Sequence, residues 1–123
     1  MRIAITGGPN TGKTTLAGTM ADGVTVVHGD DFIGLGWSQS SQALADEMVK
    51  PGPWVAEGVQ VPRALRKMLE ATPRTKPCDR LIVLTAPHVE TSDGQRRMSL
   101  GVDTVLREIV PQLRGLNVEI EIR

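Results

Sequence analysis

The chain has 123 residues, a formal net charge of zero and few aromatic side chains, namely Phe32, Trp37 and Trp54. The length and the scarcity of aromatic residues predict one domain with an aliphatic core. The net charge of zero means that no global charge attracts nucleic acid or a membrane surface. No apolar run is long enough to cross a membrane, and a single cysteine, Cys78, excludes an internal disulfide and a cysteine-based metal site. Because the first residues already resemble a strand, we expect no secretory signal and a cytoplasmic protein.

The first predicted unit is a strand, a glycine-rich loop and a helix. Residues 2–6 form an apolar run typical of a buried strand, and residues 13–21 carry apolar side chains at helical spacing. The loop between them matches G-x-x-x-x-G-K-[ST], which binds phosphate groups through backbone amides and the helix N-terminus. The residues expected to bind a nucleoside triphosphate are Gly7, Gly8, Pro9, Asn10, Thr11, Gly12, Lys13, Thr14 and Thr15.

Within this loop, Lys13 is expected to reach the β- and γ-phosphates, and the Thr14 hydroxyl is expected to bind Mg²⁺. The alternative is a glycine-rich turn that carries Lys-Thr by chance. The strand before the loop and the helix after it favour the phosphate-binding interpretation.

An acidic pair, Asp30 and Asp31, follows the second predicted strand at residues 24–28. Open parallel sheets hold their chemistry at the carboxyl ends of the strands, so we interpret the pair as functional, with a solvated turn as the alternative. Residues 34–41 are polar and glycine-rich, which predicts a mobile stretch. A short helix is expected from about residue 41 to 50; its inward-facing residues are Leu44, Ala45, Met48 and Val49.

A brief third strand at residues 54–56 ends at Glu57, and Pro62 suits the first turn of the next helix. Residues 63–80 contain six basic and two acidic side chains, which leaves a local charge of six minus two, +4. A solvated helix face and an anion-binding patch both remain open for this segment. The fourth strand, residues 80–85, is continuously apolar after Arg80 and is expected in the interior of a sheet.

Ser92 to Gln95 fits a capping box that opens a helix ending at Gly115, with an interruption expected at Gly101. Arg96 and Arg97 lie in its first turn, where positive charge opposes the helix dipole, which suggests that they bind phosphate. Residues 118–122 alternate apolar and charged side chains, a pattern typical of an edge strand with one wet face. The repeated strand–helix order predicts an α/β fold, a three-layer α/β/α sandwich with a five-stranded parallel sheet.

Three segments resemble the P-loop nucleoside kinases, of which uridine kinase and nicotinamide riboside kinase are examples. They are residues 5–17, His28-Gly29-Asp30-Asp31-Phe32 and Val55-Ala56-Glu57-Gly58. The resemblance implies the P-loop NTPase fold and a single kinase domain over residues 1–123 with a short lid around residues 88–101. It also implies ATP and Mg²⁺ as cofactors.

The resemblance further implies the roles of individual residues. Asp30 is expected to accept the proton of the acceptor hydroxyl, although the sequence leaves open which carboxylate of the pair is the base. Lys13, Arg96 and Arg97 are expected to contact the transferring phosphates. The metal ligands implied are Thr14, Asp31 and Glu57.

The segment between residues 32 and 53 has only 22 residues, and little chain follows the last strand. Both are shorter than in that family, so we expect an open acceptor side and a sparse base-recognition side. An open site admits a large acceptor such as 5-hydroxymethyluracil in phage DNA, which small phage P-loop kinases phosphorylate. The alternatives are a free nucleoside or nucleotide kinase, an NTP hydrolase and a non-catalytic nucleotide-binding regulatory module.

The sequence leaves open the acceptor, the choice between ATP and GTP, and whether the protein is a monomer or a homodimer. The two histidines, His28 and His88, are interpreted as structural, with contact between His28 and the acceptor as the alternative.

Overall fold

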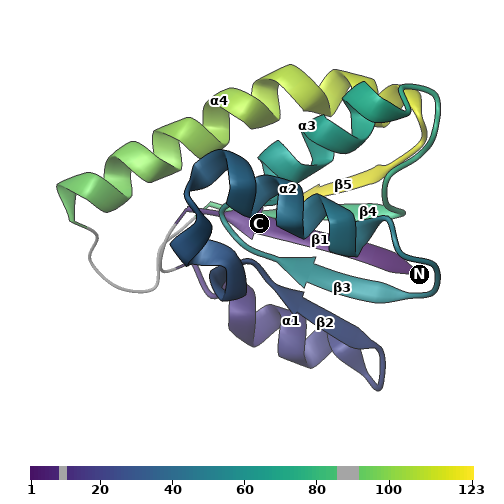
Figure 1. Ribbon diagram of the computed structural model, residues 1–123, viewed down its shortest axis with the longest axis horizontal. Helices are drawn as coiled ribbons and strands as arrows, with labels where there is room; N and C mark the ends of the chain where they lie inside the picture. The colour runs from purple at the N-terminus through teal and green to yellow at the C-terminus, as the bar shows by residue number, and fades with distance from the viewer. Residues whose placement is uncertain (9–10, 86–91) are drawn as a thin grey trace.

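A five-stranded parallel sheet organises the computed structural model, which describes residues 1–8, 11–85 and 92–123. The strands lie in the order β2-β3-β1-β4-β5 (Figure 1). They are β1 (Arg2–Gly7), β2 (Thr25–His28), β3 (Trp54–Glu57), β4 (Arg80–Leu84) and β5 (Glu119–Ile122). The helices are α1 (Lys13–Ala21), α2 (Trp37–Met48), α3 (Val61–Ala71) and α4 (Asp93–Gly115), with a short 3₁₀ helix η1 (Gly29–Leu35). The predicted α/β fold with a five-stranded parallel sheet is confirmed.

Helices cover both faces of the sheet (Figure 1). On one face α1 packs through Ala17 against Ile3 and Ile5 of β1. On the other face α2, α3 and α4 pack against Ala4 and neighbouring strand residues. Because successive strand residues point to opposite faces, β1 supplies both cores. The arrangement is compatible with a three-layer α/β/α sandwich.

The second helix differs from its prediction. It begins at Trp37 and ends at Met48, whereas a mobile stretch was expected up to residue 41. Ser40 and Ser41 are buried, and the Ser41 hydroxyl donates to the Trp37 carbonyl oxygen at 2.8 Å. Hydrophobic periodicity missed this turn because its buried residues are serines with satisfied hydroxyls. Val49 was expected to face the core and is instead 62% exposed.

The capping box at the start of α4 is confirmed. The Ser92 hydroxyl accepts from the Gln95 amide at 3.2 Å, and the Gln95 side-chain oxygen accepts from the Ser92 amide at 2.9 Å. The interruption expected at Gly101 is wrong, because α4 runs unbroken to Gly115. A β-carbon on Gly101 would lie 3.3 Å from the Arg63 guanidinium, so the glycine allows α3 and α4 to approach closely here. Of the expected lid, residues 88–91 lie outside the described part of the chain.

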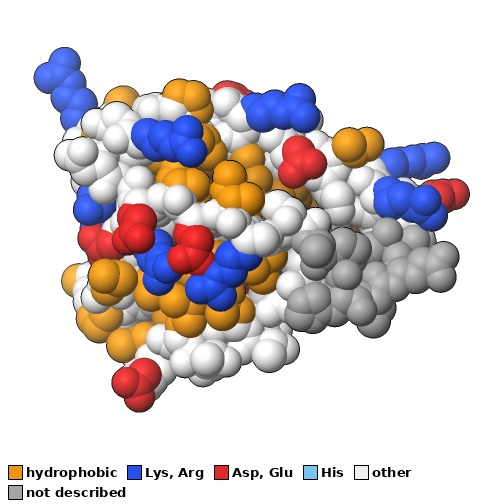
Figure 2. Space-filling model, turned by 180° about the vertical axis from the view of Figure 1, so that it is seen from behind, with side chains coloured by type: hydrophobic (Ala, Val, Ile, Leu, Met, Phe, Trp, Pro, Cys, Tyr) orange, Lys and Arg blue, Asp and Glu red, His pale blue; other side chains and the backbone are white. Residues whose placement is uncertain are grey.

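The edge position predicted for the last strand is confirmed, since β5 is the last strand of the sheet and, among the described residues, pairs with β4 alone. Arg80 forms ion pairs with Glu119 and Glu121, which places charge along this edge. Ile122 was expected on the dry face and is 66% exposed. Seen from behind, hydrophobic side chains lie exposed among acidic and basic ones (Figure 2).

Cys78 is fully buried in the larger core. Burial raises the pKa of its thiol to about 12, so this cysteine is not a nucleophile at neutral pH. Among the helices of the described residues, none is both long enough and apolar enough to cross a membrane.

Candidate functional site

The glycine-rich loop connects the end of β1 to the start of α1. Gly12 is the N-cap of α1 with a φ of 88°, a left-handed conformation that favours glycine. A β-carbon on Gly7 would lie 2.5 Å from the Leu84 carbonyl oxygen, so that position has no room for a side chain. The Thr11 hydroxyl donates to the Gly8 carbonyl oxygen at 2.9 Å and holds the loop closed. Of the nine residues predicted to bind a triphosphate, Pro9 and Asn10 lie outside the described residues.

Lys13 folds back over this loop. Its ammonium group donates to the Gly8 carbonyl oxygen at 2.8 Å. Burial lowers the pKa of Lys13 from its ordinary value of 10.5, while the nearby charges of Glu57 and Asp30 oppose that shift. A partly desolvated cation above a glycine-rich loop gains stability when an anion binds there.

Glu57, the last residue of β3, is the centre of the site and is only 2% exposed. One carboxylate oxygen accepts from the Thr14 hydroxyl at 3.3 Å, and the other lies 3.0 Å from His28 Nδ1. The sheet register explains this meeting, because Glu57 pairs with Ile5 on one side and with His28 on the other. Strand ends that are far apart in sequence therefore contribute to one polar cluster, as parallel sheets favour.

The contact between His28 and Glu57 was not predicted, because His28 was interpreted as structural. Both residues end a predicted strand, and that shared position was the only signal available in the sequence. His88, the other histidine, lies outside the described residues.

Asp30 and Asp31 are both exposed in η1, directly after β2. The negative charge of Asp30 raises the pKa of Lys13, so this carboxylate is close enough to influence the ammonium group at the loop. Asp31 makes no hydrogen bond or ion pair within the described part of the chain. The structure thus brings Thr14 and Glu57 into contact, while Asp31 forms no hydrogen bond or ion pair with either. Across residues 1–8, 11–85 and 92–123, no three His, Cys, Asp or Glu side chains are grouped as a metal site.

The two arginines near the start of α4, Arg96 and Arg97, have different surroundings. Arg96 forms an ion pair with Asp93 at 3.3 Å, one turn earlier on the same helix. Arg97 lines a cavity of about 290 Å³ together with Trp37 and Arg63. Ser99 of α4 lies against Gly8 of the loop, since a β-carbon on Gly8 would lie 2.0 Å from the Ser99 hydroxyl oxygen.

The basic segment 63–80 is divided by ion pairs. Arg66 pairs with Glu108 at 3.1 Å, Lys76 pairs with Asp79 at 3.5 Å, and Arg80 pairs with the carboxylates of β5. Arg63 instead lies over the Trp37 ring, 5.2 Å from its centroid. Three of the six basic side chains therefore pair with carboxylates, and Arg63 is the one that faces the cavity of Arg97.

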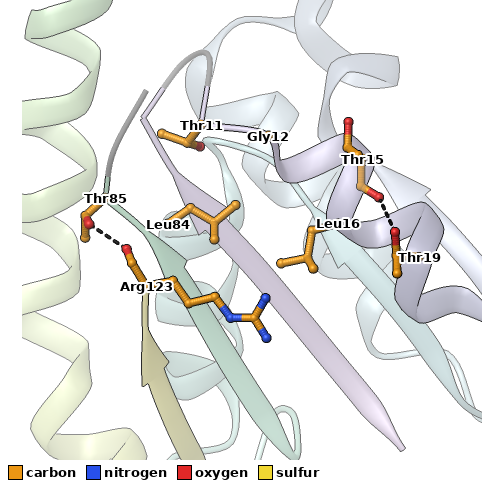
Figure 3. Close-up of a pocket in the computed structure, with 8 residues that line it drawn as sticks. All are labelled: Thr11, Gly12, Thr15, Leu16, Thr19, Leu84, Thr85 and Arg123. Carbon is orange, nitrogen blue, oxygen red and sulfur yellow. Dashed lines mark hydrogen bonds between the residues drawn. The ribbon is translucent and has the colours of Figure 1, made fainter. Parts of the chain in front are cut away.

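A second cavity, of about 380 Å³, lies beside the loop on the α1 face of the sheet (Figure 3). Thr11, Gly12 and Thr15 form the wall nearest the loop. The Arg123 side chain extends across the sheet toward Leu16 of α1 (Figure 3). The other lining residues are Thr19, Leu84 and Thr85. The wall is largely apolar with a few hydroxyl groups, a composition suited to a flat organic ring.

A comparison of the chain with models of known protein families found no match, and a comparison with curated proteins found none either.

Proposed function

We propose that this protein is a P-loop kinase that transfers the γ-phosphoryl group of ATP, with Mg²⁺, to a hydroxyl of a nucleoside-type acceptor. The observation that carries this proposal is the meeting of three groups at the strand ends. Lys13 lies over the glycine-rich loop, and the Thr14 hydroxyl contacts the buried carboxylate of Glu57. This combination supports phosphate binding and metal binding side by side.

The residues present fit a magnesium ion. A hydroxyl and a carboxylate are hard oxygen ligands, and Thr14 and Glu57 already lie within hydrogen-bond distance of each other. Asp31 is the third proposed ligand, from an exposed position in η1. Mg²⁺, when bound, would neutralise negative charge on the phosphates. His28 holds the second oxygen of Glu57, so the carboxylate keeps one orientation toward Thr14.

The nucleoside of ATP is proposed to occupy the cavity of Figure 3, which begins at the loop and continues beside α1. Its lining surface is largely apolar, and its polar groups are threonine hydroxyls and the Arg123 side chain. Lys13 exchanges its bond to the Gly8 carbonyl for phosphate oxygens. Arg96 and Arg97 are proposed to contact the transferring phosphates from the start of α4.

Asp30 is proposed as the base. It accepts the proton of the acceptor hydroxyl while that oxygen forms a bond to the γ-phosphorus, and ADP leaves with the electrons of the broken bond. The proposed acceptor is a 5-hydroxymethyl pyrimidine in DNA, 5-hydroxymethyluracil in phage DNA above all, with a free nucleoside or nucleotide as the alternative. The exposure of Asp30 supports a large acceptor.

The test is phosphate transfer from γ-labelled ATP with Mg²⁺ to free nucleosides, nucleotides, unmodified DNA and DNA that carries 5-hydroxymethyl pyrimidines. Asp30→Asn should lower turnover by about 10²-fold or more and leave ATP binding unchanged. Asp103→Asn, an exposed carboxylate on α4, is the matched control and should behave as the wild type. Label released only as inorganic phosphate would indicate a hydrolase. ATP binding without any turnover would indicate a regulatory module, and either outcome would refute the kinase proposal.

A further inference from the structure

The N-terminal ends of three helices converge on one cavity, which we name the Trp37 hollow. It is lined by Trp37 at the start of α2, by Arg63 near the start of α3 and by four residues from the first three turns of α4, Gly94, Arg97, Met98 and Gly101. A smaller cavity of about 170 Å³ adjoins it, and Trp37 and Met98 line both. Helix N-termini carry partial positive charge, so their convergence favours a ligand that bears negative charge.

Trp37 offers an aromatic surface inside this hollow. Its side chain is 45% exposed, although a tryptophan gains free energy from burial. The Arg63 guanidinium lies 5.2 Å from the ring centroid, which holds the indole in place by a cation–π contact. An exposed, fixed indole is suited to stacking with the ring of a nucleobase.

Gln60 connects the wall of the smaller cavity to the start of η1. It lines the smaller cavity and is only 1% exposed. Its side-chain amide donates to the Gly29 carbonyl at 3.0 Å and to the Ser40 hydroxyl at 3.1 Å. Its carboxamide oxygen has no hydrogen-bond partner within the described residues. That oxygen is packed against Gly29 and Gly58, where added β-carbons would lie 2.2 Å and 2.7 Å from it, so the side chain acts as a fixed wall of the cavity.

The charges of the hollow are also unbalanced. No carboxylate in the described part of the chain forms an ion pair with Arg63 or Arg97, in contrast to Arg66 and Arg96 nearby. Guanidinium groups at helix N-termini are typical partners of phosphate. An aromatic platform and two cations together match a base that carries a phosphate.

We propose that the Trp37 hollow binds the acceptor as a nucleotide unit. The base stacks on Trp37 beside the wall that Gln60 forms, and its phosphate lies at Arg63 and Arg97. This inference rests on the proposed function for the role of the bound nucleotide as phosphate acceptor. The bond from Gln60 to Gly29 connects the hollow to the residue before Asp30, the proposed base. Such a unit comes from a free nucleotide or from a DNA strand, since the chemistry recognised is the same.

The test is binding, measured by calorimetry on the full chain without ATP or Mg²⁺. The probes are dTMP, thymidine, 2-deoxyribose 5-phosphate and an eight-residue thymidine oligonucleotide. We expect dTMP to bind more tightly than thymidine and than 2-deoxyribose 5-phosphate, because each of these lacks one half of the unit. Tighter binding of the oligonucleotide would identify a strand as the source, and equal binding would identify a free nucleotide.

Trp37→Ala should weaken dTMP binding by about 5- to 150-fold, the range for loss of one base stack, and Trp37→Phe should retain most of it. Arg97→Gln should reduce dTMP affinity toward that of thymidine. Leu100→Ala removes an apolar side chain of α4 that is 65% exposed and should change nothing. Circular dichroism checks that each variant is folded.

Unchanged dTMP binding in Trp37→Ala, or equal affinity for 2-deoxyribose 5-phosphate and dTMP, would overturn the inference even if the protein proves to be a kinase. Trp37-dependent binding without phosphate transfer would leave the inference standing and refute the kinase proposal instead.

Discussion

The contact between α4 and the glycine-rich loop is close enough to be tested by a double-mutant cycle. In Gly8→Ala, the new β-carbon would lie 2.0 Å from the Ser99 hydroxyl oxygen and 2.9 Å from the Ser99 β-carbon. Rotating the serine side chain moves its oxygen but not its β-carbon, so the backbone of the loop or of α4 must shift. Overpacking of this kind costs about 1–3 kcal/mol. We expect that loss in the free energy of unfolding, measured by urea denaturation.

Ser99→Gly should rescue the variant, because it removes both clashing atoms and leaves the Ser99 α-carbon at 3.5 Å. The single change Ser99→Gly should cost only about 0.5 kcal/mol in helix propensity. The cycle should therefore give a coupling energy of about 1–3 kcal/mol. Gly18→Ala on α1 is the control, because nothing lies within 4 Å of its added β-carbon, and it should be neutral or slightly stabilising. A stable Gly8→Ala variant, or a double variant no more stable than Gly8→Ala alone, would refute the proximity of α4 to the loop.

Two further predictions concern the core and Lys13. Leu113 of α4 is fully buried, so Leu113→Ala should lower the free energy of unfolding by about 2–5 kcal/mol, whereas the exposed Leu100→Ala should stay within about 0.5 kcal/mol. Equal small effects in urea denaturation would mean that α4 does not pack on the sheet. Burial lowers the pKa of Lys13 below 10.5, so between that lowered value and 10.5 the unfolded chain binds more protons and wild-type stability rises with pH. Lys13→Met should therefore be more stable than the wild type near pH 7, with a difference that shrinks toward pH 10.5. A pH-independent difference in urea midpoints would contradict the burial of this charge.

Local patterns in the sequence were sufficient for the order of elements. The apolar runs of β1 and β4, the capping box at Ser92 and the alternation in β5 all predicted their elements, because period and capping chemistry are local properties. The strand–loop–helix motif also predicted that Lys13 and Thr14 lie at the start of α1. The same patterns failed at Ser40 and Ser41, where burial depends on hydrogen bonds to partners that no periodicity reveals.

The tertiary structure alone decided which of these residues meet. Glu57 contacts Thr14 and His28 because β3 lies between β1 and β2, an order that depends on long-range packing rather than on neighbouring residues. Likewise, Trp37 and Arg97 lie on α2 and α4, and Gln60 is the N-cap of α3; they line adjoining cavities because these helices cover the same face of the sheet. Sequence determined the residue types and their local conformations, whereas the packing of sheet and helices brought those residues together.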